Sequence, residues 1–263
     1  MEKRGYFGGK LSKKFDIKTL MENFFSPVES PAHFFGMLRK TNYRSTRPMD
    51  KHALVVWSTA VVKKAKQIKY PATYKLGIVD LAFMQKVAQL SAKDNGPILA
   101  QDYLRKHGIA LVIEPHFPQT YLDGATIMID KKHPIIALTL RHDRLDNFWF
   151  SLMHELAHVS LHFNQNFYFF YDDLDNPDSS NKQEYEADKL AGESLVPESK
   201  WEISPAKLVP STIAANSLAK ELGVHIAIVA GKIRYEGRKY IYLNRIMKQE
   251  DVRKYFPNEK WNK

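Results

Sequence analysis

The chain has 263 residues, 44% of them hydrophobic and 26% charged, which is the composition of an ordinary soluble protein with a substantial core. It contains no cysteine, so disulfides, a thiolate nucleophile and a cysteine-ligated metal are excluded. The apolar runs are too short to cross a bilayer and the N-terminus has no secretory signal, so we expect a cytoplasmic protein without membrane association.

The net charge of +10 is concentrated in the first third of the chain. Residues 1–75 carry 16 Lys and Arg against 5 Asp and Glu, whereas the remaining residues are close to neutral. This distribution favours two interpretations equally: a contact surface for nucleic acid or an acidic partner, or a lysine-rich solvated face that binds nothing specific.

The first 78 residues are predicted to form a basic, all-helical region. Aspartates that can cap a helix precede apolar residues at helical spacing over 16–25 and 50–68. A Ser-Pro pair at 30–31 is typical of the start of a further helix over 32–40. We expect this region to be followed by a second domain over 79–248 and a charged, peripheral C-terminal tail over 249–263.

The second domain is predicted to mix helices with short strands. Helices are expected over 80–92, 97–108, 147–163 (with Asp146 as its N-cap), 183–196, 213–222 and 226–234. Strands are expected over 110–114, 125–129, 134–140 and 240–244, because these segments are short, apolar and β-branched. The acidic stretch 166–181 is expected to be a solvated loop.

The predicted helix 147–163 contains His154-Glu155-Leu156-Ala157-His158. Residues four apart lie on one face of a helix, so His154 and His158 can bind one metal ion, with Glu155 beside the open coordination position. Glu155 can then accept a proton from water that a zinc ion activates. The motif therefore predicts a hydrolase site that uses Zn²⁺, with His and carboxylate ligands only.

A catalytic zinc site needs a third protein ligand. The class that takes a third histidine from the same segment is excluded, because Leu161 and Asn164 stand where that class requires Gly and His. His162 lies on the same helix face, but three ligands in series along one straight helix cannot converge on one ion, so we expect His162 to lie behind the ligands or at the surface.

The helix predicted over 183–196 offers a carboxylate, as in gluzincin-type peptidases. Glu184 and Asp188 share a face with small alanines that allow close packing against the motif helix. We expect Glu184 to be the third zinc ligand and Asp188 to hold a ligand imidazole through its free N–H. Glu186 is the alternative ligand, and helical phase disfavours it.

Three segments together carry a family resemblance. Residues 147–153 (Asn-Phe-Trp-Phe-Ser-Leu-Met) lead into the His-Glu-x-x-His motif. The second segment is Glu-Tyr-Glu-Ala-Asp at 184–188, and the third is Leu-Val-Pro at 195–197. Over about residues 95–245 the chain resembles the ImmA/IrrE family of zinc metallo-endopeptidases. The resemblance implies an α+β fold: a helical N-terminal region plus a gluzincin-like peptidase domain, with a small mixed sheet packed on the motif helix.

The resemblance also implies a function. Known members cleave a helix-turn-helix repressor in stress-response, mobile-element or toxin–antitoxin settings. For this chain, the resemblance implies that Glu155 is the catalytic acid/base and that His154, His158 and Glu184 are zinc ligands. Many relatives, including those linked to HigA-type antitoxins, carry an XRE-type helix-turn-helix unit ahead of the peptidase domain; we expect that unit to be absent here. The alternative is a weakly active or non-proteolytic regulator or sensor that uses the zinc fold to bind a partner.

A substrate peptide is expected to bind as a strand along the edge of the small sheet, around residues 126–130.

Overall fold

The computed structural model describes residues 1–4, 6–7, 16–28, 41–44, 49–128, 132–163, 169–172, 181–237, 243–247 and 251–261. Within these ranges the α-helices are α1 (Ile17–Phe25), α3 (Lys51–Lys66), α4 (Leu81–Gln89), α5 (Gly96–Lys106), α6 (Leu145–His162), α7 (Lys182–Leu195), α8 (Glu198–Trp201), α9 (Pro205–Leu208), α10 (Thr212–Leu222), α11 (Ile226–Glu236) and α12 (Asn244–Met247). The strands are β1 (Thr41–Arg44), β2 (Ala110–Ile113), β3 (Gly124–Ile127), β4 (Ile135–Leu138) and β5 (Phe169–Asp172). No helix in these ranges is long and apolar enough to cross a membrane.

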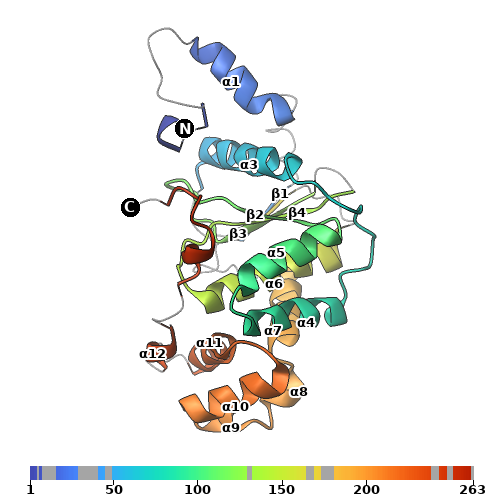
Figure 1. Cartoon of the computed structure of the whole chain (residues 1–263), viewed down its shortest axis with the longest axis vertical. Coiled ribbons are helices and arrows are strands. Elements are labelled where there is room, and N and C mark those ends of the chain that lie inside the picture. The colour runs from blue at the N-terminus through green and yellow to red at the C-terminus, as the bar shows by residue number, and fades with distance from the viewer. Residues whose placement is uncertain are drawn as a thin grey trace.

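The strands form one mixed sheet in the order β1-β5-β3-β4-β2. β2 and β4 are parallel, β3 is antiparallel to both β4 and β5, and β1 runs parallel to β5. Helices α1 and α3 lie on one side of the sheet, and α4 to α7 lie on the other with α8 to α11 beyond them (Figure 1). The α+β fold with a small mixed sheet is therefore confirmed.

Successive residues of each strand point to opposite faces of the sheet, and this alternation divides the apolar core in two. In β4, Ile136 and Leu138 join the cluster on the α6 face, whereas Ile135 and Ala137 join the cluster on the α3 face. All four residues of β2, β3 and β4 are buried, as expected for strands covered by helices on both faces.

The helix starts follow the local sequence signals. Asp16, Asp50 and Asp80 each occupy an N-cap, and their side chains accept hydrogen bonds from backbone N–H groups of the first turn. The cap predicted for α6 is wrong: the helix begins at Leu145 with Arg144 at the N-cap position. Asp146 instead lies in the first turn, where its carboxylate favours the helix dipole and pairs with Arg144 at 2.6 Å.

Three expectations about secondary structure need correction. The N-terminal region is not all-helical, because Thr41–Arg44 is strand β1 and pairs with β5. The stretch 166–181 is not simply a solvated loop, because Phe169–Asp172 is strand β5. Asn244, expected at the end of a strand, begins helix α12. The helix predicted over 32–40 and most of the strand predicted over 240–244 lie outside the described residues.

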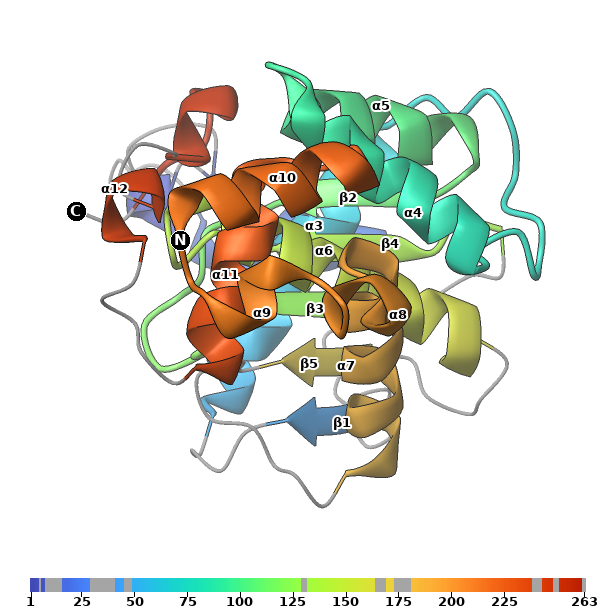
Figure 2. The ribbon, with the colours of Figure 1, turned by 90° about the horizontal axis from the view of Figure 1, so that it is seen from below.

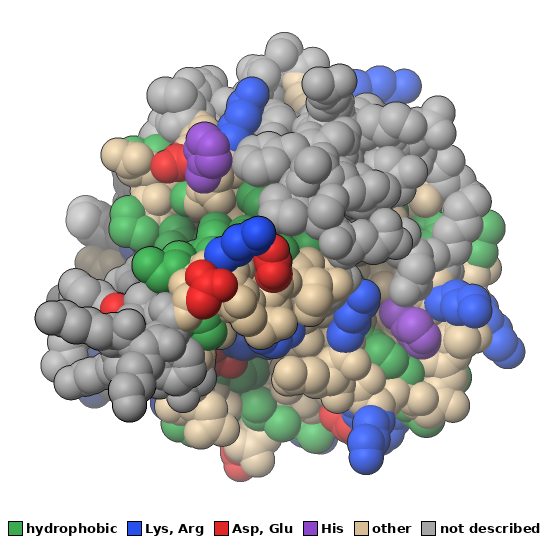
Figure 3. All heavy atoms as spheres, turned by 90° about the horizontal axis from the view of Figure 1, so that it is seen from above, with side chains coloured by type: hydrophobic (Ala, Val, Ile, Leu, Met, Phe, Trp, Pro, Cys, Tyr) green, Lys and Arg blue, Asp and Glu red, His purple; other side chains and the backbone are tan. Residues whose placement is uncertain are grey.

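The N-terminal region shares its core with the sheet. Phe24, Leu54 and Trp57 pack in the same apolar cluster as residues of β2 to β5. Glu114, which follows β2, is 3% exposed and forms ion pairs with Arg4 and Lys64. Two cations of this basic region therefore have a structural role. On the face shown in Figure 3, the Lys and Arg side chains of described residues are dispersed rather than gathered into one patch.

The C-terminal segment is not a peripheral tail as predicted. Val252 and Phe256 are buried in the α6-face core, at 0% and 7% exposure. The Asp143 carboxylate accepts hydrogen bonds from the backbone N–H groups of Val252 and Arg253, both at 2.8 Å. The segment is charged in composition, but its apolar side chains pack in or against this core.

Candidate metal centre

Helix α6 carries His154 and His158 on the side facing α7. Both imidazoles are fully buried, and their Nε2 atoms lie 3.0 Å apart. The helix is buried on nearly all sides because apolar residues surround the motif along its whole length. Figure 2 shows β3, β5 and β1 side by side, with α7 on the viewer's side of them. The two histidines are thus held between the sheet and α7.

Helix α7 adds Glu184 to this pair. Its Oε2 lies 3.2 Å from His154 Nε2 and 3.4 Å from His158 Nε2, and the side chain is 2% exposed. Ala187 and Ala191 are fully buried on the same helix, so the small side chains allow α7 to approach α6 closely. The side chain of Glu186 is 40% exposed and faces His162 instead, at 3.4 Å. The structure therefore brings Glu184, and not Glu186, to the two histidines.

A fourth group, Asp172 at the end of β5, was missed by the sequence reasoning. Its Oδ2 lies 3.2 Å from His154 Nε2 and 3.7 Å from His158 Nε2, and the residue is fully buried. Neither carboxylate oxygen has a well-formed hydrogen bond. The available signal was the aromatic run Phe169–Tyr171, which favours a strand that would carry the following acid into the interior.

The ligand atoms of His154, His158, Asp172 and Glu184 all lie within 4.8 Å of one another. In a tetrahedral site with bonds of about 2.0–2.1 Å, ligand atoms are about 3.3–3.4 Å apart. The separations given above run from 3.0 to 3.7 Å. These five separations fit a tetrahedral ion of the size of zinc, and the sixth, between the Asp172 and Glu184 oxygens, is within 4.8 Å.

Further side chains orient the two imidazoles. His154 Nδ1 lies 2.9 Å from Asp188 Oδ1, so the Asp188 carboxylate can accept the N–H that leaves Nε2 free for a metal. His158 Nδ1 lies 3.0 Å from His162 Nδ1, and His162 Nε2 lies 3.4 Å from Glu186 Oε2. His162, for which the sequence left either a role behind the ligands or a surface position, is 1% exposed and lies against the second imidazole.

Glu155 lies between β3 and the metal-binding side chains. Thr126 donates a hydrogen bond of 2.7 Å from its hydroxyl to Glu155 Oε2. A Cβ at Gly124 would be 2.3 Å from Glu155 Oε1, so any larger residue at this position of β3 would displace the Glu155 carboxylate. Burial raises the pKa of the Glu155 carboxyl well above its usual range, and the neighbouring Asp172 carboxylate raises it further.

Burial and neighbouring charges shift the pKa values of the site's ionisable groups in opposite directions. Burial alone would lower the pKa of His154, but the Asp172, Asp188 and Glu184 carboxylates raise it well above its usual range. Burial opposes ionisation of Glu184, but the hydrogen bonds with His154 and His158 hold the pKa of its carboxyl well below the usual range. A buried carboxylate cluster of this kind needs positive charge, which protonated histidines or a metal ion can supply.

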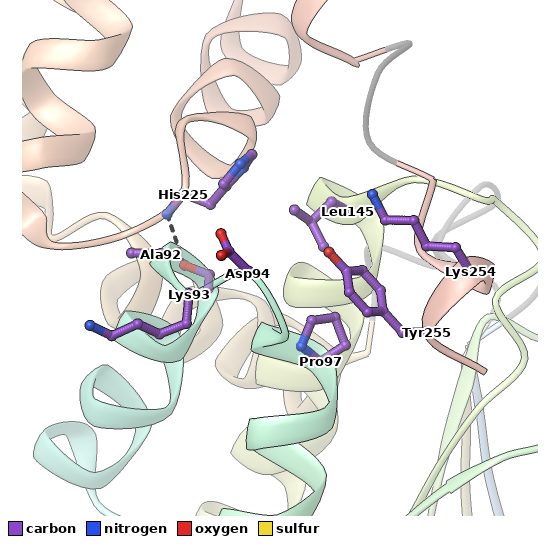
Figure 4. A pocket seen from close by; sticks show the side chains of 9 residues that line it. Ala92, Lys93, Asp94, Pro97, Leu145, His225, Lys254 and Tyr255 are labelled. Atoms are coloured by element: carbon purple, nitrogen blue, oxygen red, sulfur yellow. Dashed lines mark hydrogen bonds between the residues drawn. The ribbon is translucent and has the colours of Figure 1, made fainter.

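A separate surface pocket of about 330 Å³ contains none of these groups. It is lined by Lys93, Asp94, Leu145, His225 and Tyr255 among others, and the His225 backbone N–H donates to Ser91 Oγ at 2.8 Å (Figure 4). Leu145 precedes His154 by nine residues of α6, which is about 14 Å along a helix. The pocket therefore does not open onto the metal-binding side chains.

Residues 104–234 match the family model described as the IrrE N-terminal-like domain, Peptidase_M78. This part of the chain belongs to that family. The match runs from α5 to α11 and contains the clustered side chains of α6, α7 and β5 that could hold a metal ion. It also contains α10 and α11, which assigns this helical pair to the peptidase domain. A search of the curated proteins finds no match.

Membership makes the domain one of a metallopeptidase family, and the four buried ligands give it a possible metal site. The roles that the sequence assigned to His154, His158, Glu184, Glu155 and Asp188 stay predictions, although all five side chains lie together. The division of the chain at residue 78 also stays a prediction, as does contact between residues 1–75 and a nucleic acid or acidic partner.

Proposed function

We propose that this protein is a zinc-dependent endopeptidase of the ImmA/IrrE type that cleaves a specific helix-turn-helix repressor in a stress-response, mobile-element or toxin–antitoxin setting. The observation that carries the proposal is the contact of Glu155 with Thr126 beside the two histidines and Glu184. A purely structural metal site would not need a buried glutamate whose carboxyl pKa burial has raised.

Each residue has a defined task in this proposal. His154, His158 and Glu184 hold the zinc ion, which supplies Lewis-acid activation of water and of the peptide carbonyl. Glu155 accepts the proton of the attacking water and delivers it to the leaving amine, because its buried carboxyl follows His154 directly on α6 and is held by the Thr126 hydroxyl. Thr126 fixes the orientation of the Glu155 carboxylate, and Asp188 fixes that of the His154 ring.

The test combines metal analysis with cleavage of repressors encoded next to this gene. We expect one zinc per chain in the wild type and in Glu155→Gln, because the glutamine leaves the ligands in place. Cleavage should fall by about 10²–10⁴-fold in Glu155→Gln, the range for loss of a general acid–base group. Absence of zinc, or cleavage that survives the substitution, would rule out the proposed mechanism.

A second candidate function is a regulator or sensor that binds a partner without cleaving it. The observation that favours it is the presence of four buried protein ligands, since structural zinc sites are closed in this way whereas catalytic sites keep one position open. The two functions make opposite predictions about Asp172. If the protein is a regulator, opening the fourth position should produce no peptidase activity.

A further inference from the structure

The metal-binding side chains are sealed from solvent. His154, Glu155, His158, Asp172 and Glu184 are each at most 2% exposed. A peptidase must bring a peptide carbonyl within reach of its general base, so a site this closed cannot admit a substrate without movement of a neighbouring segment.

The elements around the site differ in which of the proposed catalytic groups they would carry away if they moved. Moving α6 would displace two histidines and Glu155, and moving α7 would displace Glu184. Moving β3 would remove the Thr126 hydroxyl from Glu155. Strand β5 contributes only Asp172 to the four-ligand set, so its departure leaves the two histidines, Glu155, Glu184 and Thr126 on α6, α7 and β3. It would also remove Phe170, whose ring stacks on that of His158 at 4.4 Å between centroids, and would separate β1 from the sheet.

Strand β5 occupies the place where a substrate strand would bind. It pairs antiparallel with β3 in the register Gly124↔Asp172 and Thr126↔Phe170, and the Asp123 N–H donates to the Asp172 carbonyl at 2.8 Å. Gly124 and Thr126 are the β3 residues that contact Glu155. A chain paired with this strand therefore passes directly by the general base, and strand addition is a common mode of peptide binding. The sequence analysis predicted that a substrate peptide binds along this edge of β3, and in the structure the protein's own strand β5 covers that edge.

The end of β5 also fills the fourth ligand position. Asp172 Oδ2 lies at 3.2 and 3.7 Å from the two imidazole Nε2 atoms, which are separations that a tetrahedral site requires. Both Asp172 oxygens are buried without a well-formed hydrogen bond, and a bound cation would satisfy them. In a catalytic site this position belongs to water or substrate.

We propose that β5 is an internal inhibitory strand: it occupies the substrate track along β3, and Asp172 binds the active-site metal as its fourth protein ligand. The inference rests on the proposed peptidase function. It makes the protein a latent enzyme that is activated when an extended segment of the repressor replaces β5 on β3 and Asp172 leaves the metal. Both candidate functions above then describe states of one molecule.

The coordination test uses protein loaded with Co²⁺, whose visible absorption reports the ligands of the metal. Acetohydroxamate, a small metal-binding anion, is added to the wild type, Asp172→Ala and Asp172→Asn. We expect the absorption of both variants to shift at concentrations that leave the wild type unchanged. An equal shift in all three proteins would overturn the proposal, because it would mean that the fourth position is already open.

Zinc retention provides a second readout that does not depend on activity. In competition with a chelator, each Asp172 variant should lose more zinc affinity than the roughly 10–100-fold expected when an outer partner of a ligand is removed. The matched control is Tyr171→Phe, on the same strand but on the opposite sheet face, where its hydroxyl bonds to Ser58 Oγ at 2.6 Å. This control should retain zinc like the wild type. Unchanged retention in the Asp172 variants would contradict ligation.

Cleavage of the repressor separates failure of the inference from failure of the proposed function. If both hold, Asp172→Ala cleaves at least tenfold faster than the wild type, and Asp172→Ala/Glu155→Gln is inactive. Equal rates for the wild type and Asp172→Ala would overturn the inhibitory strand and leave the peptidase function standing. If neither protein cleaves although zinc is bound and acetohydroxamate enters the Asp172→Ala site, the peptidase function fails while Asp172 remains a ligand.

Discussion

Two buried acidic sites lie on opposite faces of the sheet, and they are neutralised in different ways. On the α3 face, Glu114 forms ion pairs with Arg4 and Lys64 at 3.5 and 2.9 Å. On the α6 face, Glu184 and Asp172 have His154 and His158 as their ion-pair partners. Arg and Lys hold their charge permanently, whereas imidazoles can lose their protons and become metal ligands. The first site therefore has fixed cationic partners, and the second has the groups that could hold a cation.

The largest effect should come from removing a ligand on the α6 face. Glu184→Ala should reduce zinc affinity by more than the roughly 10–100-fold expected for an outer partner of a ligand. Glu186→Ala should retain zinc far better, since Glu186 contacts His162 rather than the ligand atoms. Dialysis against a chelator followed by metal analysis measures both. Equal zinc loss in the two variants would contradict the assignment of Glu184.

Removing the buried carboxylate on the α3 face should lower the stability of the fold without changing zinc affinity. Glu114→Gln removes a buried carboxylate and leaves Arg4 and Lys64 without their charged partner. Because Lys64 is 34% exposed and can regain water, we expect a loss of about 1–3 kcal/mol rather than the full cost of a broken buried pair. Denaturant unfolding gives the stability and chelator competition gives the zinc affinity. A change in zinc affinity would show that the two faces are not independent.

Side chains that only orient the ligands should have intermediate effects. His162→Ala and Asp188→Ala should each weaken zinc binding about 10–100-fold, because His158 and His154 lose the groups that hold their Nδ1 atoms. His162→Asn, which keeps a polar group near His158, should recover part of the loss. Zinc affinity equal to the wild type in all three variants would mean that packing alone orients the rings.

The smallest expected effect is a change in how the stability of the fold depends on pH, and it comes from His116. Burial, with help from Arg141 and Arg4, lowers the pKa of His116 to about 4 in the folded protein. The unfolded chain therefore binds more protons between about pH 6.5 and 4, and stability should fall as the pH drops through that range. In His116→Asn this fall should be smaller by about 1 kcal/mol after allowance for partial exposure. His52→Asn, at a side chain that is 88% exposed, should behave like the wild type.

The sequence predicted the features that depend on local signals and not those that depend on contacts between distant segments. Caps and periodicity located α1, α3, α4, α5 and β2 to β4 because these signals are local. The His-Glu-x-x-His motif and the phase of α7 pointed to His154, Glu155, His158, Glu184 and Asp188, which lie together. Asp172 was missed because its position depends on the pairing of β5 with β3, a contact between distant segments that one strand does not encode. The C-terminal segment was misjudged for the same reason, since the burial of Val252 and Phe256 depends on a distant core.

The most direct test of the account is anomalous diffraction at the zinc absorption edge from crystals of the zinc-loaded protein. We expect one strong peak that His154, His158, Glu184 and Asp172 all contact, with β5 paired to β3. A peak elsewhere, or no peak, would contradict the metal centre. A peak contacted by the histidines and Glu184 only, with β5 away from β3 and Asp172 away from the metal, would agree with the proposed peptidase function. It would contradict the proposal that β5 is an inhibitory strand.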